Sequence, residues 1–256
     1  MKITFLGTGT SQGIPVIGCR CPVCQSDDRR DVRRRASIAI ENGDTTVIID
    51  TSPDFRMQVI DAGIAHLDAV LFTHPHADHL HGLDDIRGFN HVQRHPIPVW
   101  GSAMTLAVIR EAFRYIFEAP NHGGGLPEIT LNEITGPICI GDMKFEPLKV
   151  FHGPVPILGF RFADVAYITD ASRLPQETLE KLCGLDILIL NALRWEPHST
   201  HLSIGEAVSL ARSLEARRSY FTHVCHRVAH RDVEAALPDQ THLAHDGLVL
   251  FSDGAK

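Results

Sequence analysis

The stretch that decides the fold is His74-Pro75-His76-Ala77-Asp78-His79-Leu80-His81-Gly82, which holds four histidines and one aspartate within eight residues. It follows the apolar run Ala69-Val70-Leu71-Phe72, a pattern typical of a buried parallel strand. Pro75 biases His74 towards an extended conformation, so the cluster begins on a loop at the strand end. Imidazoles and carboxylates are ligands of zinc and similar metals. We therefore expect a metal site here rather than a solvated histidine-rich loop, because binding sites are often built at the carboxyl ends of parallel strands.

The spacing His-x-His-x-Asp-His resembles the signature of the metallo-β-lactamase superfamily, and the resemblance extends from Leu6-Gly7-Thr8-Gly9 to Asp246-Gly247. It implies an α/β fold, a four-layered αββα sandwich, formed as a single hydrolase domain over residues 1–256. It also implies two divalent metals, zinc or manganese, in a site between two sheets. The implied ligands of one metal are His74, His76 and His152. Those of the other are Asp78, His79 and His223, with Asp170 as the bridge and Asp50 as the acceptor that orients a ligand histidine.

A second group of metal-binding residues is Cys19-Arg20-Cys21-Pro22-Val23-Cys24, which places three thiols within six residues. Three thiolates can supply three ligands of a tetrahedral zinc. The cysteine pattern resembles that of the phosphodiesterase family of bacterial carbon–phosphorus lyase operons, which acts on cyclic ribosyl phosphates. That resemblance implies one structural zinc whose fourth ligand is His226, three residues after His223. Cys225 is the alternative fourth ligand, although its side chain would alternate to the other side if the strand continues.

The polar loop before the helix that starts at Ser203 contains two further histidines, His198 and His201. The matching loop of the same family carries its catalytic histidine at the position of His201. We therefore expect His201 to act as a general acid that protonates the leaving oxygen, a role that suits a group with an unperturbed pKa of about 6.5. His198 is the alternative.

The glycine-rich turn at residues 7–13 matches neither the dinucleotide-binding pattern nor the phosphate-binding P-loop. In the superfamily this loop lies beside the metal site. Ser11 and Gln12 are therefore candidate substrate contacts. A second glycine-rich segment, at residues 120–127, is predicted to be a flexible loop that either covers the active site or connects two elements.

Charge and composition limit which partners and which cellular compartment we expect for this protein. A net charge of −7 does not favour binding of a large nucleic acid. No apolar run approaches the roughly 20 residues that span a bilayer, and residues 1–10 lack the features of a signal peptide. We therefore expect a cytoplasmic protein without membrane contact, in which the cysteines are thiols or metal ligands rather than disulfides. The sequence leaves a homodimer open.

Apolar periodicity predicts alternating strands and helices, with the basic stretch at residues 28–35 as a solvated connector. The predicted strands are 2–6, 36–40, 45–49, 69–72, 97–100, 129–134, 138–140, 144–150, 159–162, 165–169, 185–190, 219–222 and 248–251. The predicted helices are 53–62, 83–92, 105–117, 175–183, 203–214 and 231–237.

Together these features predict an enzyme that hydrolyses a phosphodiester in a small ribosyl phosphate or nucleotide, cyclic substrates included, through a metal-bridging hydroxide. Two alternatives remain. One is a metallo-hydrolase or oxygenase similar to the pyrroloquinoline-quinone biosynthesis relative, which also has an N-terminal cysteine loop. The other is a non-catalytic nucleotide-binding protein on the same fold, although retention of every ligand position argues against it.

Overall fold

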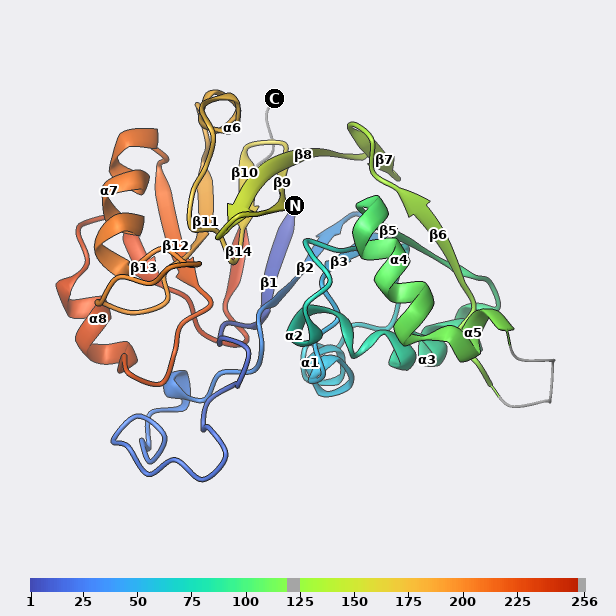
Figure 1. Ribbon diagram of the computed structural model, residues 1–256, viewed down its shortest axis with the longest axis horizontal. Helices are drawn as coiled ribbons and strands as arrows, with labels where there is room; N and C mark the ends of the chain where they lie inside the picture. Colours follow the sequence, from blue (N-terminus) through green and yellow to red (C-terminus); the bar gives the residue numbers. More distant parts are fainter. Residues whose placement is uncertain (119–124, 253–256) are drawn as a thin grey trace.

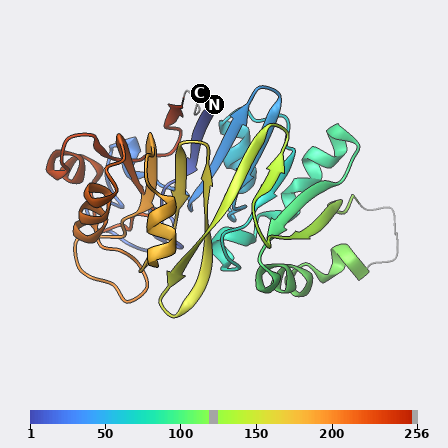
Figure 2. The same cartoon turned by 90° about the horizontal axis from the view of Figure 1, so that it is seen from above.

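Two seven-stranded sheets pack face to face in the computed structural model, which describes residues 1–118 and 125–252 (Figures 1 and 2). The first sheet has the order β14-β1-β2-β3-β4-β5-β6. Its strands are β1 (Lys2–Gly7), β2 (Ser37–Asn42), β3 (Thr45–Ile49), β4 (Ala69–Leu71), β5 (Ile97–Gly101), β6 (Ile129–Glu133) and β14 (Val249–Phe251). The strands from β14 to β3 are antiparallel and those from β3 to β6 are parallel.

The second sheet repeats this arrangement with the order β13-β12-β11-β10-β9-β8-β7. Its strands are β7 (Ile138–Ile140), β8 (Met143–His152), β9 (Val155–Phe162), β10 (Val165–Ile168), β11 (Ile187–Asn191), β12 (Arg218–Thr222) and β13 (Thr241–Leu243). Strands β7 to β10 are antiparallel and β10 to β13 are parallel. Each sheet is therefore mixed; the N-terminal part of the chain supplies six strands of the first sheet, and β14, near the C-terminus, completes it.

Helices cover the outer face of each sheet, as Figures 1 and 2 show. The first sheet carries α1 (Phe55–Asp61), α2 (Ala77–Leu80), α3 (Arg87–Gln93), α4 (Ala103–Ala112) and α5 (Arg114–Glu118). The second carries α6 (Gln176–Lys181), α7 (Ile204–Leu214) and α8 (His230–Ala236). Short 3-10 helices occupy Arg29–Asp31 and Leu83–Ile86.

Three apolar layers hold the sandwich together, and strand alternation assigns each side chain to its layer. In β11, Ile187 and Ile189 enter the core between the sheets, whereas Leu188 and Leu190 pack under the helices of the second sheet. The third layer lies between the first sheet and its helices. The predicted αββα sandwich is confirmed.

Several predicted elements differ in detail. The predicted helix at 105–117 divides at Phe113, whose backbone leaves α4 with φ −112° and ψ 37°. This break keeps the buried Phe113 ring against His81, at 6.0 Å between ring centroids. The predicted helix at 83–92 divides into a 3-10 turn and α3, and strand β13 was not predicted. Helix α7 begins with the predicted capping box of Ser203 and Glu206.

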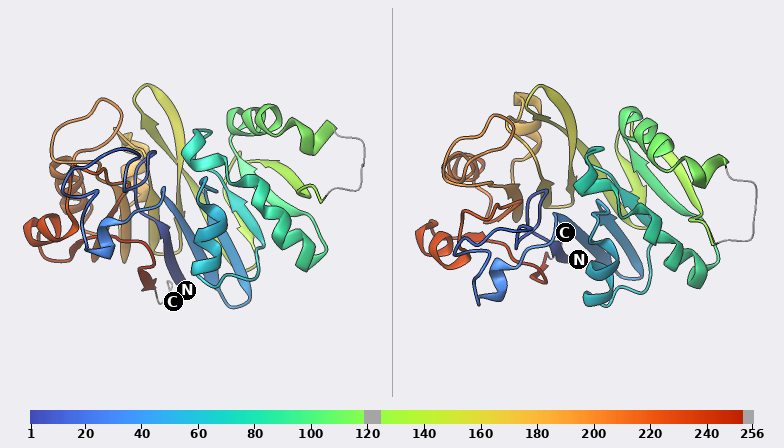
Figure 3. Two further views of the ribbon diagram at one scale, coloured as in Figure 1. Left: turned by 90° about the horizontal axis from the view of Figure 1, so that it is seen from below. Right: turned by 60° about the horizontal axis from the view of Figure 1, so that its bottom comes forward.

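The prediction of a solvated connector at residues 28–35 is wrong for Arg33, which is 1% exposed. Its guanidinium pairs with Asp31 at 2.9 Å and donates to the carbonyl oxygens of Cys225 and Val228 at 3.3 and 3.0 Å. Arginine can be buried here because these acceptors satisfy its planar set of donors. Figure 3 shows the segment between β1 and β2, in blue, beside the orange-red C-terminal part of the chain. The hydrogen bonds of Arg33 connect the two.

Two further predictions concern the glycine-rich segment and membrane contact. The glycine-rich segment at 120–127 lies largely outside the described residues, because 119–124 are not among them. Within the described part of the chain, no helix combines the length and the apolarity that crossing a bilayer requires.

Candidate metal centre

Polar residues at strand ends converge between the two sheets. His74 follows β4, His152 ends β8, Asp170 follows β10 and His223 follows β12. The backbone is unusual at Asp170 and His223, with φ of 58° and 57°, and also at Asp50, with φ of 66°. Residues other than glycine seldom adopt this left-handed conformation, so the surrounding contacts must hold these residues in place.

The histidine-rich stretch at residues 74–82 begins as an extended segment and continues into one helical turn, α2. His76 is extended at φ −65° and ψ 150°, and α2 then carries the largely buried Asp78 and His79. Gly82 closes the turn against the chain that follows β3. A Cβ at Gly82 would lie 2.0 Å from the carbonyl oxygen of Ser52, so only glycine allows this approach.

Asp170 lies at the centre of the cluster. Its Oδ2 is 3.2 Å from His79 Nε2, and its Oδ1 is 3.1 Å from His223 Nε2 and 3.0 Å from His201 Nε2. Within the described residues, three candidate ligand groups have ligand atoms within 4.8 Å of one another, and two of them lie in this cluster: Asp78, His79, Asp170 and His223, and His152, Asp170 and His201. Asp170 is common to both.

The histidines expected to bind one metal also lie together. The ring centroids of His74 and His76 are 4.5 Å apart, and those rings lie 5.7 and 5.1 Å from the ring of His152. His201 was expected to lie near the metals without being a ligand. Its Nε2 lies 3.0 Å from Asp170 Oδ1, and His201 belongs to a candidate ligand group with His152 and Asp170, so its role stays a prediction.

A hydrogen-bond network orients the imidazoles. Asp50 accepts from His79 Nδ1 at 2.7 Å and from the Thr73 hydroxyl at 2.8 Å, and the Thr73 oxygen lies 3.0 Å from His74 Nδ1. His152 Nδ1 donates to the carbonyl oxygen of Asp170 at 2.8 Å. Since a donating Nδ1 leaves the lone pair on Nε2, these contacts prepare the imidazoles as metal ligands.

The electrostatics of the cluster favour a cation. Burial alone would lower the pKa of His79, but the carboxylates of Asp170, Asp50 and Asp78 outweigh it and raise that pKa well above its usual range. Burial lowers the pKa of His74 well below its usual range, so this imidazole is neutral and able to bind metal. Several buried carboxylates need compensating positive charge, which divalent metals supply.

Buried atoms without partners provide the test of fit. The Nε2 atoms of His74, His79 and His223 are buried and form no well-directed hydrogen bond within the described residues, although those of His79 and His223 lie 3.2 and 3.1 Å from oxygens of Asp170. A buried polar atom that is left unsatisfied is costly. Because these atoms belong to imidazoles beside carboxylates, the residues fit a divalent metal centre.

The cysteine group forms a separate candidate site. Sγ of Cys19, Cys21 and Cys24 lies 3.3, 3.5 and 3.7 Å from His226 Nδ1. The hydrogen bond from the Cys24 N–H lowers the pKa of the Cys21 thiol to about 6, which favours the thiolate that zinc binds. Cys225 lies outside this group, because its side chain packs in the apolar core of the second half. This set fits a closed tetrahedral zinc.

Comparison with known proteins identifies the family. The family model described as a beta-lactamase superfamily domain matches residues 45–224. The chain belongs to the metallo-β-lactamase superfamily. The domain that it forms is that of a metal-dependent hydrolase.

Three known proteins are similar to this chain over nearly all of its length. The crystal structure of a diphosphatase from the PhnP family superposes with a TM-score of 0.93 at 40% identity, covering 99% of this chain and 98% of that one. A coenzyme PQQ synthesis protein B from Methylobacterium sp. (strain 4-46) is 33% identical over 98% of this chain and 99% of its own. An octanoyltransferase from Porphyromonas gingivalis is 36% identical over 99% of this chain, which spans only 52% of that protein.

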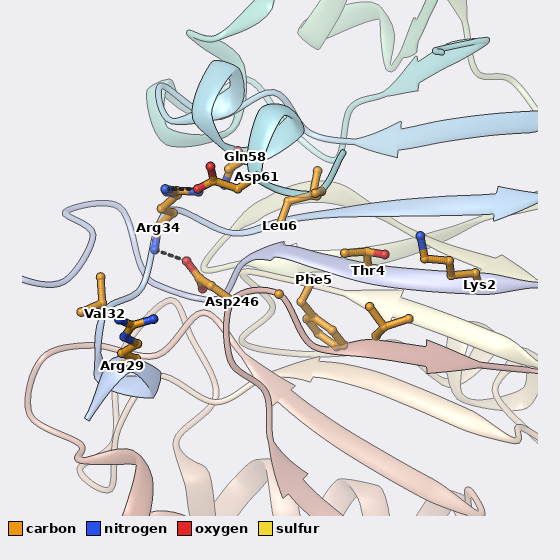
Figure 4. Close-up of a pocket in the computed structure, with 13 residues that line it drawn as sticks. Lys2, Thr4, Phe5, Leu6, Arg29, Val32, Arg34, Gln58, Asp61 and Asp246 are labelled. Carbon is orange, nitrogen blue, oxygen red and sulfur yellow. Dashed lines mark hydrogen bonds and ion pairs between the residues drawn. The ribbon is translucent and has the colours of Figure 1, made fainter. Parts of the chain in front are cut away.

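One cavity of the described chain lies away from the candidate metal centre. It has a volume of about 650 Å³ and lies at β1, with Lys2, Arg34 and Asp246 among its lining residues (Figure 4). Arg34 N–H donates to Asp246 at 2.7 Å, and the Arg34 side chain pairs with Asp61 at 2.6 Å. No candidate metal ligand of the described chain lines this cavity.

The remaining site predictions concern the glycine-rich turn. Ser11 and Gln12 are exposed, and the Ser11 carbonyl oxygen accepts from Arg35 Nε at 3.0 Å. Their role as substrate contacts stays a prediction.

The sequence analysis did not single out two residues of this region, Thr73, which directly precedes His74, and Asn191. Asn191 is a polar residue at the end of an apolar strand, and this pattern is visible in the sequence.

Proposed function

We propose that this chain is a dinuclear-metal phosphodiesterase that acts on a small ribosyl phosphate or nucleotide-like substrate, cyclic diesters included. The observation that carries the proposal is that Asp170 is shared by two candidate ligand groups. The similarity to a PhnP-family diphosphatase supports phosphorus as the site of reaction. The proposal does not assign the substrate of that diphosphatase to this chain.

In this proposal His74, His76 and His152 hold one metal, Asp78, His79 and His223 hold the other, and Asp170 bridges them. When bound, two such metals supply charge stabilisation at the phosphoryl group and an activated water. Asp50 contributes by fixing His79 directly and His74 through Thr73.

His201 is the proposed proton donor to the leaving oxygen. Its Nδ1 lies 2.9 Å from the Thr200 hydroxyl and 3.2 Å from His198 Nδ1. Its Nε2 lies 3.0 Å from Asp170 Oδ1, and this short distance supports a role for His201 at the proposed metal centre. A positioned acid typically contributes 10²–10⁴-fold to such a reaction.

The match to coenzyme PQQ synthesis protein B supports the alternative, a hydrolase or oxygenase of that type. A substrate panel separates the two functions. Metal-loaded protein should hydrolyse phosphodiesters or diphosphates faster than phosphomonoesters, thioesters and lactams. Turnover of thioesters or lactams without diesterase activity would overturn the proposal and favour a hydrolase of the alternative type, and absence of any hydrolysis would favour its oxygenase form or a non-catalytic protein.

The cysteine group is proposed to hold one structural zinc through Cys19, Cys21, Cys24 and His226. His226→Ala should lose this zinc and unfold at a lower temperature, because removing one ligand opens the closed tetrahedral shell. Cys225→Ala is the matched control and should keep its zinc. Zinc analysis of the two purified variants provides the measurement. Full zinc retention in His226→Ala with loss in Cys225→Ala would assign the fourth ligand to Cys225.

A further inference from the structure

Asn191 ends the middle one of three parallel strands that lead to the metal centre. β10 leads to Asp170 and β12 leads to His223, and β11 lies between them. Asn191 is fully buried. Since a buried amide must satisfy its donors and acceptor, its partners indicate its role.

The Asn191 side chain makes a pair of hydrogen bonds with the backbone of Ala171. The Ala171 N–H donates to Oδ1 at 2.8 Å, and Nδ2 donates to the Ala171 carbonyl oxygen at 3.0 Å. The same carbonyl oxygen accepts from the Leu202 N–H at 2.8 Å. Ala171 directly follows Asp170 and Leu202 directly follows His201, so one amide holds the backbone beside both residues.

The backbone of Asp170 needs this support. Its φ of 58° lies in the left-handed region, which persists at residues other than glycine only where neighbouring contacts impose it. Contacts to the backbone here include the Asn191 pair on Ala171 and the bond from His152 Nδ1 to the Asp170 carbonyl oxygen, and the Thr169 hydroxyl donates to the Asp170 carboxylate at 2.6 Å. Without the amide, the backbone can return to a common conformation and carry the carboxylate away from His79.

The residues after Asn191 extend the same connection. The Ala192 N–H donates to the carbonyl oxygen of Thr222, which precedes His223, at 2.9 Å, and the Leu193 N–H donates to that of Leu202 at 3.0 Å. We propose that Asn191 is a positioning residue that sets the Asp170 carboxylate, and through Leu202 the His201 ring, for metal binding. This inference rests on the proposed function, because it assigns Asn191 to the same metal centre.

The test compares Asn191→Ala and Asn191→Ser with Asn90→Ala. Asn90 is a matched control, because it is 7% exposed and its amide pairs with the backbone of Glu128 at 2.9 and 3.0 Å, outside the metal centre. Chelator competition with Zn²⁺ and Mn²⁺ measures active-site affinity, and zinc analysis measures the structural site. We expect both Asn191 variants to bind the active-site metals about 10–100-fold more weakly and to keep the structural zinc.

Asn90→Ala should lose stability without losing metal affinity. Wild-type affinity in a folded Asn191 variant, or an equal loss of affinity in Asn90→Ala, would overturn the inference. Asn191→Ser keeps a polar group that is too short to form both hydrogen bonds with Ala171. Its metal affinity tests the inference if the alanine variant does not fold. Failure of both Asn191 variants to fold, with Asn90→Ala folded, would contradict a positioning role. If the wild-type protein binds no active-site metal, the proposed function fails, and the inference fails with it.

Discussion

Replacement of Asp170 with alanine should abolish tight binding of two active-site metals and lower phosphodiester hydrolysis by roughly 10³-fold or more. Asp170 belongs to both candidate ligand groups, so its loss weakens both at once. A metal centre contributes several kcal/mol of charge stabilisation, and about 4 kcal/mol corresponds to 10³ in rate. Metal analysis of the purified variant and its rate on a phosphodiester provide the measurements.

Asp170→Asn is the control that separates charge from backbone strain. Asparagine tolerates the left-handed conformation better than alanine does, and it removes only the carboxylate charge. Both variants should keep the zinc of the cysteine group. Two tightly held active-site metals in Asp170→Ala would contradict the bridging role.

His201→Ala should lower hydrolysis of a diester with a poor alkoxide leaving group by about 10²–10⁴-fold, because the leaving oxygen then departs without a proton. The loss should be smaller on a nitrophenyl ester, whose leaving group needs little protonation. Steady-state rates on the two substrates provide the comparison.

A metal count of the same variant distinguishes the two roles open to His201. As the proton donor, His201 can be removed while both metals stay. If His201 is instead a ligand beside His152 and Asp170, the variant should lose a metal. His198→Ala is the matched control, since His198 lies in the same loop at 3.2 Å from His201. Equal and small losses on both substrates would mean that His201 is not the acid.

The resemblance carried by the His-x-His-x-Asp-His stretch implied the layered fold and the set of metal ligands, and apolar periodicity predicted most of the strands. His74, Asp170 and His223 each lie just beyond the carboxyl end of a predicted strand, a place where binding sites are often built.

Features that depend on tertiary contacts were not predictable in this way. Arg33 is buried because carbonyl oxygens far along the chain accept its donors, and no local pattern encodes those partners. The break at Phe113 likewise serves a contact with His81. The position of Asn191 was visible in the sequence, but its pairing with Ala171 required the arrangement of three strands.

The most direct test of the central claim is a metal titration of activity. Protein stripped of its active-site metals, with the cysteine-group zinc retained, is titrated with Zn²⁺ or Mn²⁺ while hydrolysis of a phosphodiester is followed. The account predicts little activity at the start and a rise that is complete at two equivalents. Full activity before any metal is added, or no diester hydrolysis after two metals have bound, would contradict it.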